Sequence, residues 1–226
     1  MAARTILKLT LAILGMPFVA LSRVSEALDW WGIKRDITRC LHAVDATTLR
    51  LPALFVAVLI RAEDHRHELH CGVDPVAMMR ALWVRVRSGK IQGASTIEQQ
   101  FVRVISGRYE RTLTRKLREQ ALAIAVARRR GKAQIAESYL ALAYYGSRLR
   151  GTAGLLAACG ADLNAASPRL VFGMIARLKY PEPSQSAPQW EAKLQRRIRH
   201  IELRFKEVDK KALAADNYCS NAEQPR

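Results

Sequence analysis

Two adjacent carboxylates and three imidazoles follow directly on an apolar run in the stretch RAEDHRHELHCG, residues 61–72. The apolar run covers residues 51–60, so Glu63 and Asp64 lie where apolar sequence meets polar sequence. Partial desolvation raises the pKa of a carboxyl group and makes the carboxylate a better base. Taken alone, such a pair at a helix end is usually a solvated cap, with general acid–base chemistry as the alternative.

The histidines and cysteines do not form the pattern of a metal site. His65, His67 and His70 lack the i, i+4 helical spacing of a zinc site with a third ligand nearby. The four cysteines have no CxxC spacing, which favours isolated thiols, although export would allow one disulfide whose partners the sequence does not assign. The cysteines are Cys40, Cys71, Cys159 and Cys219.

A second group of polar residues follows a flexible connector, KIQGA. In STIEQQFVRVISG, Ser95 and Glu98 have the spacing of a helix capping box. In RKLRE, Arg115 and Lys116 precede Glu119 by four and three residues, so a helix brings both cations within reach of the carboxylate. Taken alone, such pairs are ordinary surface ion pairs worth a few tenths of a kcal/mol.

Four short motifs, in this order, resemble those of the peptidoglycan glycosyltransferases of glycosyltransferase family 51. The family patterns are EDxxFxxHxG, GxSTxxQQ, RKxxE and KxxILxxYLN, and the resemblance covers roughly residues 50–205. Each motif is weak by itself, but their order and separations make the set specific. The matched residues are Glu63, Asp64, His70 and Gly72; Gly93, Ser95, Thr96, Gln99 and Gln100; Arg115, Lys116 and Glu119; and Lys132, Ile135, Tyr139 and Leu140.

Four positions depart from these patterns. His67 occupies the usual aromatic position, and Ala141 replaces an asparagine. Arg103 stands where lysine is common and keeps the positive charge. Glu98 replaces a threonine, and a capping box with Ser95, which would stabilise the helix by about 1 kcal/mol, offers an explanation. His67 and Ala141 leave both carboxylates in place. They motivate an alternative function, a catalytically degenerate protein that binds lipid II or a cell-wall partner without polymerising it.

The resemblance implies polymerisation of lipid II by inverting β-1,4 glycosyl transfer with release of undecaprenyl diphosphate. Such a reaction needs a base on the acceptor hydroxyl and stabilisation of a dianionic leaving group. Glu63 matches the family's general base. Glu119 matches the second glutamate, which supports the diphosphate directly, through basic neighbours or through a divalent cation, Mg²⁺ or Mn²⁺. The expected substrate-binding residues are Asp64, His70, Gly72, Ser95, Thr96, Gln99, Gln100, Arg103, Arg111, Arg115 and Lys116.

The elements that must position these residues are predicted to be helices. From Thr48 onward the apolar residues recur with a helical period nearly everywhere, and no stretch has the alternation and β-branched enrichment of a strand. The Asp74-Pro75 pair starts a helix that Gly89 ends, Gly107 ends the following helix, and the Ser167-Pro168 pair starts a later one. The sequence therefore predicts an all-α fold class.

The chain is expected to divide into three segments. With the resemblance, residues 46–208 form a lysozyme-like glycosyltransferase domain, 1–45 a hydrophobic and juxtamembrane segment, and 209–226 a charged tail. The apolar residues 6–21 include Lys8 and fall short of the roughly 20 residues that span a bilayer comfortably. They form a signal peptide or an anchor, with the anchor favoured. The resemblance then implies a location at the bacterial inner membrane, with the catalytic domain on the periplasmic side.

The charge of the chain favours an anionic partner. Lysine and arginine total 37 against 20 acidic residues, a formal net charge of +17. No zinc-knuckle, RNA-binding aromatic or Walker motif is visible, so nucleic acid is not among the expected partners, and a cationic helical nucleic-acid binder is an alternative that rests on charge alone. The expected partners are lipid II, the growing glycan strand, inner-membrane lipids and cell-wall synthesis proteins. The SxxK motif of a transpeptidase is not visible in the sequence. A glycan-cleaving enzyme on a related fold is a further alternative.

Overall fold

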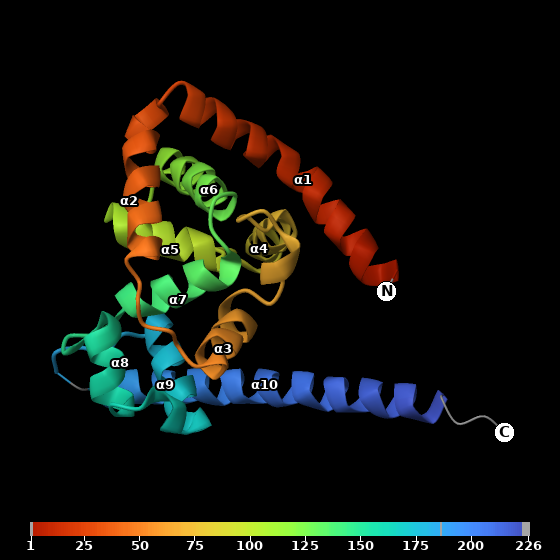
Figure 1. Cartoon of the computed structure of the whole chain (residues 1–226), viewed down its shortest axis with the longest axis vertical. Coiled ribbons are helices and arrows are strands. Elements are labelled where there is room, and N and C mark those ends of the chain that lie inside the picture. Colours follow the sequence, from red (N-terminus) through yellow and green to blue (C-terminus); the bar gives the residue numbers. More distant parts are fainter. Residues whose placement is uncertain (1, 186, 223–226) are drawn as a thin grey trace. The chain divides into compact units, whose positions relative to one another are not determined.

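The fold is built almost entirely from helices. The computed structural model describes the backbone of residues 2–185 and 187–222 and the side chains of residues 4–185 and 187–206. In Figure 1, coiled ribbons account for nearly all of the chain with regular structure. The expected all-α class is confirmed.

The chain forms two compact units. The first contains Met1–Leu51 and Glu63–Ala143, and the second contains Pro52–Ala62 and Tyr144–Arg226. All four sequence motifs lie in the first unit. The expected boundaries of the three sequence segments stay a prediction, because this grouping follows spatial contacts and not the roles of the segments.

Helix α6 is the centre of the first unit. Every side chain from Arg118 to Val126 is buried, and α1, α2 and α5 pack against this helix. The alanines of the run ALAIAVA favour the helical conformation and let neighbouring helices approach closely. The elements of this unit are α1 (Ala2–Ala27), η1 (Trp30–Gly32), α2 (Ile33–Asp45), η2 (His67–Leu69), α4 (Pro75–Ser88), α5 (Ile97–Ser106), α6 (Leu113–Ala127) and α7 (Lys132–Leu142).

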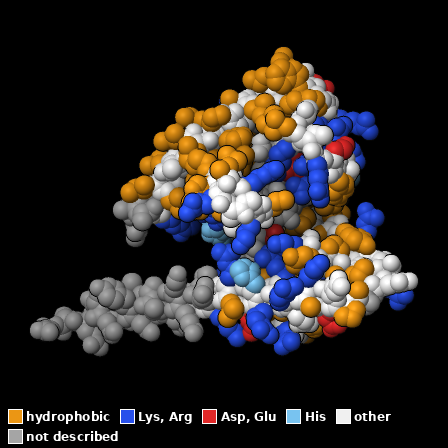
Figure 2. Space-filling model, turned by 180° about the vertical axis from the view of Figure 1, so that it is seen from behind, with side chains coloured by type: hydrophobic (Ala, Val, Ile, Leu, Met, Phe, Trp, Pro, Cys, Tyr) orange, Lys and Arg blue, Asp and Glu red, His pale blue; other side chains and the backbone are white. Residues whose placement is uncertain are grey.

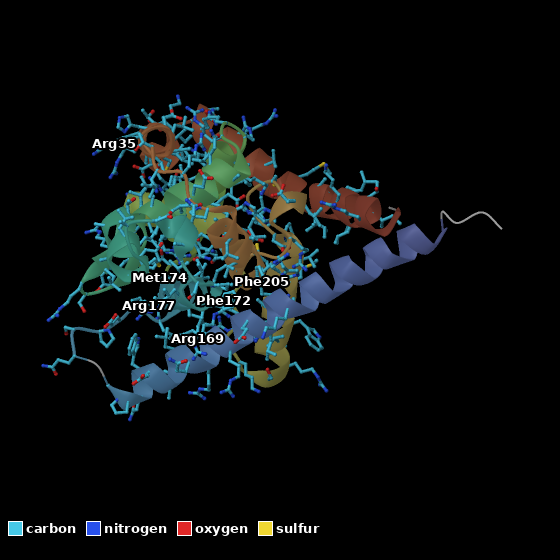
Figure 3. The ribbon with its side chains drawn as sticks, turned by 60° about the horizontal axis from the view of Figure 1, so that its bottom comes forward. Arg35, Arg169, Phe172, Met174, Arg177 and Phe205 are labelled. Carbon is cyan, nitrogen blue, oxygen red and sulfur yellow. The ribbon has the colours of Figure 1, made fainter. Side chains whose placement is uncertain are left out.

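Aromatic contacts hold the helices of the second unit together. The rings of Phe172 and Phe205 (Figure 3) lie 5.6 Å apart between centroids. The Arg61 guanidinium lies 4.2 Å from the centroid of the Phe205 ring. These contacts join α3, α9 and α10. The elements are α3 (Ala53–Glu63, whose last residue groups with the first unit), β1 (Tyr144–Gly146), β2 (Leu149–Arg150), α8 (Gly151–Cys159), η3 (Leu163–Ala165), α9 (Pro168–Lys179) and α10 (Pro188–Ala222).

Helix α10 covers most of the segment expected to be a charged tail. It ends at Ala222, and residues 223–226 lie outside the described part of the chain. The long helix carries lysine and arginine along much of its length, as the sequence shows.

Most predicted helix ends are confirmed. Asp74 caps α4, with its carboxylate accepting a hydrogen bond from the Ala77 N–H at 2.8 Å. Ser167 caps α9 in the same way. Gly89 and Gly107 follow α4 and α5 with φ angles of 67° and 64°, a conformation that glycine adopts without steric cost.

The expectation that the chain contains no strand is wrong in one place. Strands β1 and β2 form a short antiparallel pair. The Glu182 N–H donates to the Tyr145 carbonyl at 3.0 Å, and the Ser147 N–H donates to the Glu182 carbonyl at 3.0 Å. A Cβ atom at Gly146 would lie 2.5 Å from the Glu182 Cβ atom. The close approach of a distant segment stabilises this turn, which local periodicity does not reveal.

Helix α1 packs within the first unit and also presents an apolar face. Leu11 is buried, and the Ser22 hydroxyl donates to the Ala121 carbonyl of α6 at 2.8 Å. Arg4–Ala27 is long and apolar enough to cross a membrane, by length and composition. The helix is therefore longer than the apolar run of the sequence. Hydrophobic side chains gather along its exposed side (Figure 2), namely Ile6, Leu9, Ile13 and Met16.

Candidate active site

Glu63 lies at the end of α3 and is half-buried. Its Oε2 atom accepts a hydrogen bond from the Gln100 amide at 3.4 Å, and Gln100 Oε1 accepts from the Tyr139 hydroxyl at 2.7 Å. Burial and the nearby Glu63 charge both raise the pKa of Tyr139, so this hydroxyl stays protonated and donates. Helices α5 and α7 thus position the side chains around the Glu63 carboxylate.

Asp64 has a different environment from its neighbour. It is buried, accepts from His70 Nε2 at 3.0 and 3.1 Å, and accepts from the Ile97 N–H at 3.2 Å. Burial alone would raise the pKa of the Asp64 carboxyl, but hydrogen bonding and charge interactions with His67 and His70 outweigh burial and hold it well below its usual range. Asp64 is therefore a fixed anion that ties the loop after Glu63 to the start of α5.

Gly72 brings this loop close to α6. Its N–H donates to His70 Nδ1 at 3.1 Å, and its carbonyl accepts from the Thr96 hydroxyl at 2.7 Å. Gly72 has a φ of 112°, and a Cβ atom there would lie 3.0 Å from the Ala123 carbonyl oxygen. Only glycine fits both the conformation and the space.

Thr96, not Ser95, caps α5. The Thr96 hydroxyl accepts from the Gln99 N–H at 3.3 Å. Ser95 instead accepts from Lys116 Nζ at 3.1 Å and from Arg103 Nη2 at 3.4 Å. The predicted capping box of Ser95 and Glu98 is therefore wrong. Ser95 and Thr96 are neighbouring hydroxyl residues, and the hydrogen bond from Thr96 to the Gly72 carbonyl fixes Thr96 as the cap.

Glu119 is surrounded by cations. Its carboxylate accepts from Arg103 Nε at 2.8 Å, from Arg103 Nη2 at 3.0 Å and from Lys116 Nζ at 2.7 Å, and it also pairs with Arg115. Lys116 Nζ donates further to Gln99 Oε1 at 2.7 Å. Burial would raise the pKa of Glu119, but Arg103 and Lys116 lower it below its usual range. The carboxylate is therefore ionised and orients the three cations.

Helix α5 connects the two carboxylates. Gln100 contacts Glu63, and Arg103, which follows one turn later, contacts Glu119. Along this helix, Gln100 thus presents an amide to one carboxylate, and Arg103 presents a cation to the other. This division suits a reaction that removes a proton at one place and stabilises negative charge at another.

One predicted binding residue lies outside this arrangement. Arg111 is exposed immediately before the Thr112 cap of α6. Within the described part of the chain, the ion pairs of Glu119 involve Arg103, Arg115 and Lys116 and do not involve Arg111. Its predicted contact with the diphosphate stays a prediction.

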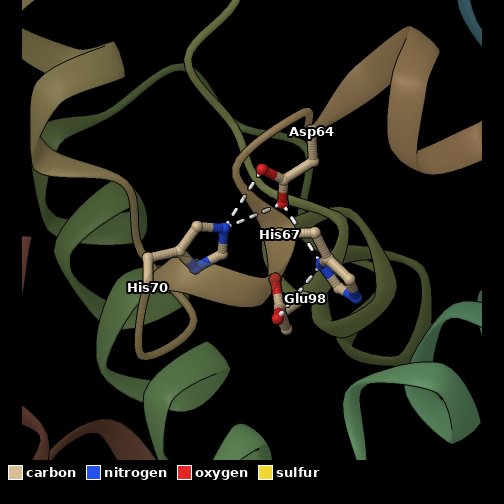
Figure 4. Close-up of side chains that lie close together, drawn as sticks. All are labelled: Asp64, His67, His70 and Glu98. Atoms are coloured by element: carbon tan, nitrogen blue, oxygen red, sulfur yellow. Dashed lines mark hydrogen bonds and ion pairs between the residues drawn. The ribbon is translucent and has the colours of Figure 1, made fainter. Parts of the chain in front are cut away.

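Two of the motif departures meet in the interior. Glu98 pairs with Lys132 at 2.6 Å between Oε1 and Nζ, and the same oxygen lies 3.6 Å from His67 Nδ1 (Figure 4). Sequence reasoning missed this contact. The available signal was the presence of two unusual ionisable residues within the matched motifs. Ala141, the other marked departure, is half-buried near the end of α7.

The transglycosylase family model matches residues 38–200. The chain belongs to the transglycosylase family. This is the glycosyltransferase family 51 that the motifs resemble, so the expected family and the helical, lysozyme-like fold class are confirmed. The matched range contains all four motifs.

Penicillin-binding proteins are relatives of this transglycosylase. Penicillin-binding protein 1A of Escherichia coli (strain K12) is 39% identical over 139 residues, which cover 61% of this chain and 16% of the relative. Penicillin-binding protein 1A of Vibrio cholerae is 29% identical over 212 residues, covering 92% and 24%. That of Aquifex aeolicus (strain VF5) is 41% identical over 99 residues, covering 43% and 14%. The chain spans less than a quarter of each of these relatives.

Proposed function

We propose that this transglycosylase is a peptidoglycan glycosyltransferase. In this proposal it polymerises lipid II by inverting β-1,4 transfer and releases undecaprenyl diphosphate. The observation that carries the proposal is the arrangement along α5, where Gln100 contacts Glu63 and Arg103, one turn later, contacts Glu119 within a cationic cluster.

Glu63 is the proposed general base. Its half-buried carboxylate takes the proton from the 4-hydroxyl of the acceptor sugar while that oxygen forms a bond to the anomeric carbon of the donor. The bond from the anomeric carbon to the diphosphate breaks, and its electron pair leaves on the diphosphate. The Gln100 amide orients the Glu63 carboxylate for this step. Asp64 is unsuited to it because its oxygens are buried and already accept hydrogen bonds.

Arg103, Arg115 and Lys116 are proposed to hold the departing diphosphate. Three cations face the single Glu119 carboxylate, so this cluster carries an excess of positive charge where negative charge develops. Glu119 is proposed to act by orienting these cations. Of the three routes that the sequence left open for Glu119, this is support of the diphosphate through basic neighbours. Ser95 and Gln99 contact Lys116 and complete the polar wall.

The surroundings of Glu119 do not fit a resident Mg²⁺ or Mn²⁺ ion. Both carboxylate oxygens accept hydrogen bonds from Arg103 and Lys116, and three positive side chains would repel a further cation. Hard divalent cations prefer a set of oxygen ligands. The proposed neutralisation of the diphosphate therefore uses the side chains alone.

Membrane association completes the proposal. Helix α1 would anchor the chain in the bacterial inner membrane, with the active site on the periplasmic side. The lipid tail of lipid II would stay in the bilayer while its head group reaches the active site. A strongly basic protein also suits an acidic membrane surface. The growing glycan strand, inner-membrane lipids and cell-wall synthesis proteins are the corresponding proposed partners.

Labelled lipid II tests this function. Full-length protein in detergent is expected to form glycan polymer and to release undecaprenyl diphosphate. Glu63→Gln is expected to lower turnover by at least about a hundredfold, because an amide cannot accept the proton, while lipid II binding persists. Gel analysis of the polymer and a binding assay measure the two effects.

The same experiment separates the alternatives. Binding of lipid II without polymer would indicate a degenerate binding protein, and cleavage of preformed glycan would indicate a hydrolase. Near-normal turnover of Glu63→Gln would remove the base assignment.

A further inference from the structure

A cluster of buried ionisable side chains joins the loop after Glu63 to the first turn of α5, and its members are Asp64, His67, His70 and Glu98 (Figure 4). The side chains of His67 and Glu98 have 0% exposure, and His67 Nδ1 lies 3.6 Å from Glu98 Oε1 and 3.4 Å from Asp64 Oδ2. Asp64 also pairs with His70, and Glu98 also pairs with Lys132. Charged groups in such an interior are stable only when they are paired, so the partners must be specified closely.

The donor atoms of this cluster invite a metal interpretation, which the contacts disfavour. Asp64, His67, His70 and Glu98 each offer one ligand atom within 4.8 Å of the others. However, the Gly72 N–H donates to His70 Nδ1, so the ring proton lies on Nε2, which donates to Asp64 and has no lone pair for a metal. The Lys132 ammonium already occupies Glu98 Oε1.

His67 instead joins two segments that carry active-site residues. Its Nδ1 atom faces two carboxylates, which are both acceptors, so Nδ1 carries a proton. Asp64 directly follows Glu63, and Glu98 lies two residues before Gln100. The His67–Glu98 contact therefore lies close in sequence to Glu63 and Gln100, whose side chains are joined by a hydrogen bond of 3.4 Å.

We propose that the His67–Glu98 contact is a positioning device for the active site. His67 and Glu98 do not touch the reacting groups; they set the distance between the Glu63 carboxylate and the first turn of α5. Lys132 extends the contact to the start of α7, the helix that supplies Tyr139. This inference rests on the proposed role of Glu63 and adds two residues that act through it.

A mutant cycle tests the device. His67→Phe keeps an aromatic ring without the ring nitrogens, and Glu98→Thr removes the carboxylate. Each single variant is expected to lower kcat for lipid II about tenfold. The double variant is expected to recover to within about threefold of the unmodified protein, because neither His67 nor Glu98 is then left facing a mismatched partner, and Lys132, whose side chain is 20% exposed, can reach solvent. KM should change less than about twofold, since the cationic cluster is untouched. Steady-state kinetics of full-length protein measure both constants.

A matched control separates positioning from stability. Asp36 and Arg118 form another buried ion pair in the same unit. Asp36→Asn is expected to lower the thermal midpoint and to leave the kcat of the folded protein unchanged. If the single variants at His67 and Glu98 behave in this way as well, their role is only structural and the proposal is overturned. Should Glu98→Thr fail to fold, the isosteric Glu98→Gln variant provides the same comparison.

Two further outcomes are distinguishable. Independent, multiplicative effects of His67→Phe and Glu98→Thr on kcat would overturn the inference, as would one equivalent of zinc in elemental analysis that is lost in His67→Phe. If lipid II is not polymerised at all, the proposed function fails first. Non-additive shifts of the thermal midpoint in the same cycle would then still support the His67–Glu98 contact, and additive shifts would remove it.

Discussion

At the scale of single residues, environment separates two carboxylates that the sequence presents as equivalent. Glu63 is half-buried beside an amide, whereas Asp64 is buried among His70, His67 and a backbone N–H. The sequence could predict that this pair carries chemistry, but it could not divide the roles. That division depends on α5, whose residues are more than thirty positions away.

Asp64 is expected to make the stability of the first unit sensitive to acid. Its pKa is lowered in the folded protein, so the stabilisation is present above its unfolded pKa of about 3.9 and is lost as the pH falls below that value. Thermal unfolding measured in steps from about pH 6 down to about pH 2 should show the decline, which begins below about pH 5. Asp64→Asn should lower the thermal midpoint near neutral pH and flatten the acid dependence. An unchanged dependence would contradict the assignment.

At the scale of elements, local signals predicted the helix ends well because caps depend on neighbouring residues. Asp74, Gly89 and Gly107 occupy the positions that the sequence indicates. The failures have distant causes. The choice of Thr96 over Ser95 depends on the Gly72 carbonyl, and the β1–β2 pair depends on Glu182. No local pattern contains such information.

The two hydroxyls at the start of α5 are expected to behave differently when they are removed. Thr96→Ala loses the helix cap and a buried hydrogen bond to Gly72, and should lower the free energy of unfolding by about 1–3 kcal/mol. Ser95→Ala should lower it by less than about 0.5 kcal/mol but reduce turnover, because Lys116 and Arg103 lose a contact. Urea unfolding and lipid II kinetics measure the two effects. Equal losses of stability would contradict the assignment of the cap.

At the scale of the whole molecule, one helix serves two environments. Leu11 and Ser22 face the interior of the first unit, while Ile13 on the same helix is 59% exposed. A leader that is removed near Ala20 would take the buried Leu11 with it. The packing of α1 therefore supports the retained anchor that the sequence favours, and this stays a proposal.

Substitutions on the two faces of α1 are expected to separate folding from membrane binding. Leu11→Ala creates a cavity and should lower the free energy of unfolding by about 2–5 kcal/mol in detergent. Ile13→Asn should change it by less than about 0.5 kcal/mol but weaken partition into anionic lipid vesicles, because an exposed apolar contact is lost. Unfolding curves and vesicle sedimentation provide the readouts. If Leu11→Ala weakened vesicle binding and left the free energy of unfolding unchanged, Leu11 would face lipid, and α1 would leave the first unit in a bilayer.

The short chain of contacts from Tyr139 through Gln100 to Glu63 also limits where a captured hydrogen ion can go. An amide does not relay protons at neutral pH, and the tyrosine already holds its own. Under the proposed mechanism, neither Gln100 nor Tyr139 therefore takes the hydrogen ion from Glu63 after a sugar addition. The base is reset by another acceptor, so each round waits until that acceptor has reached the carboxylate.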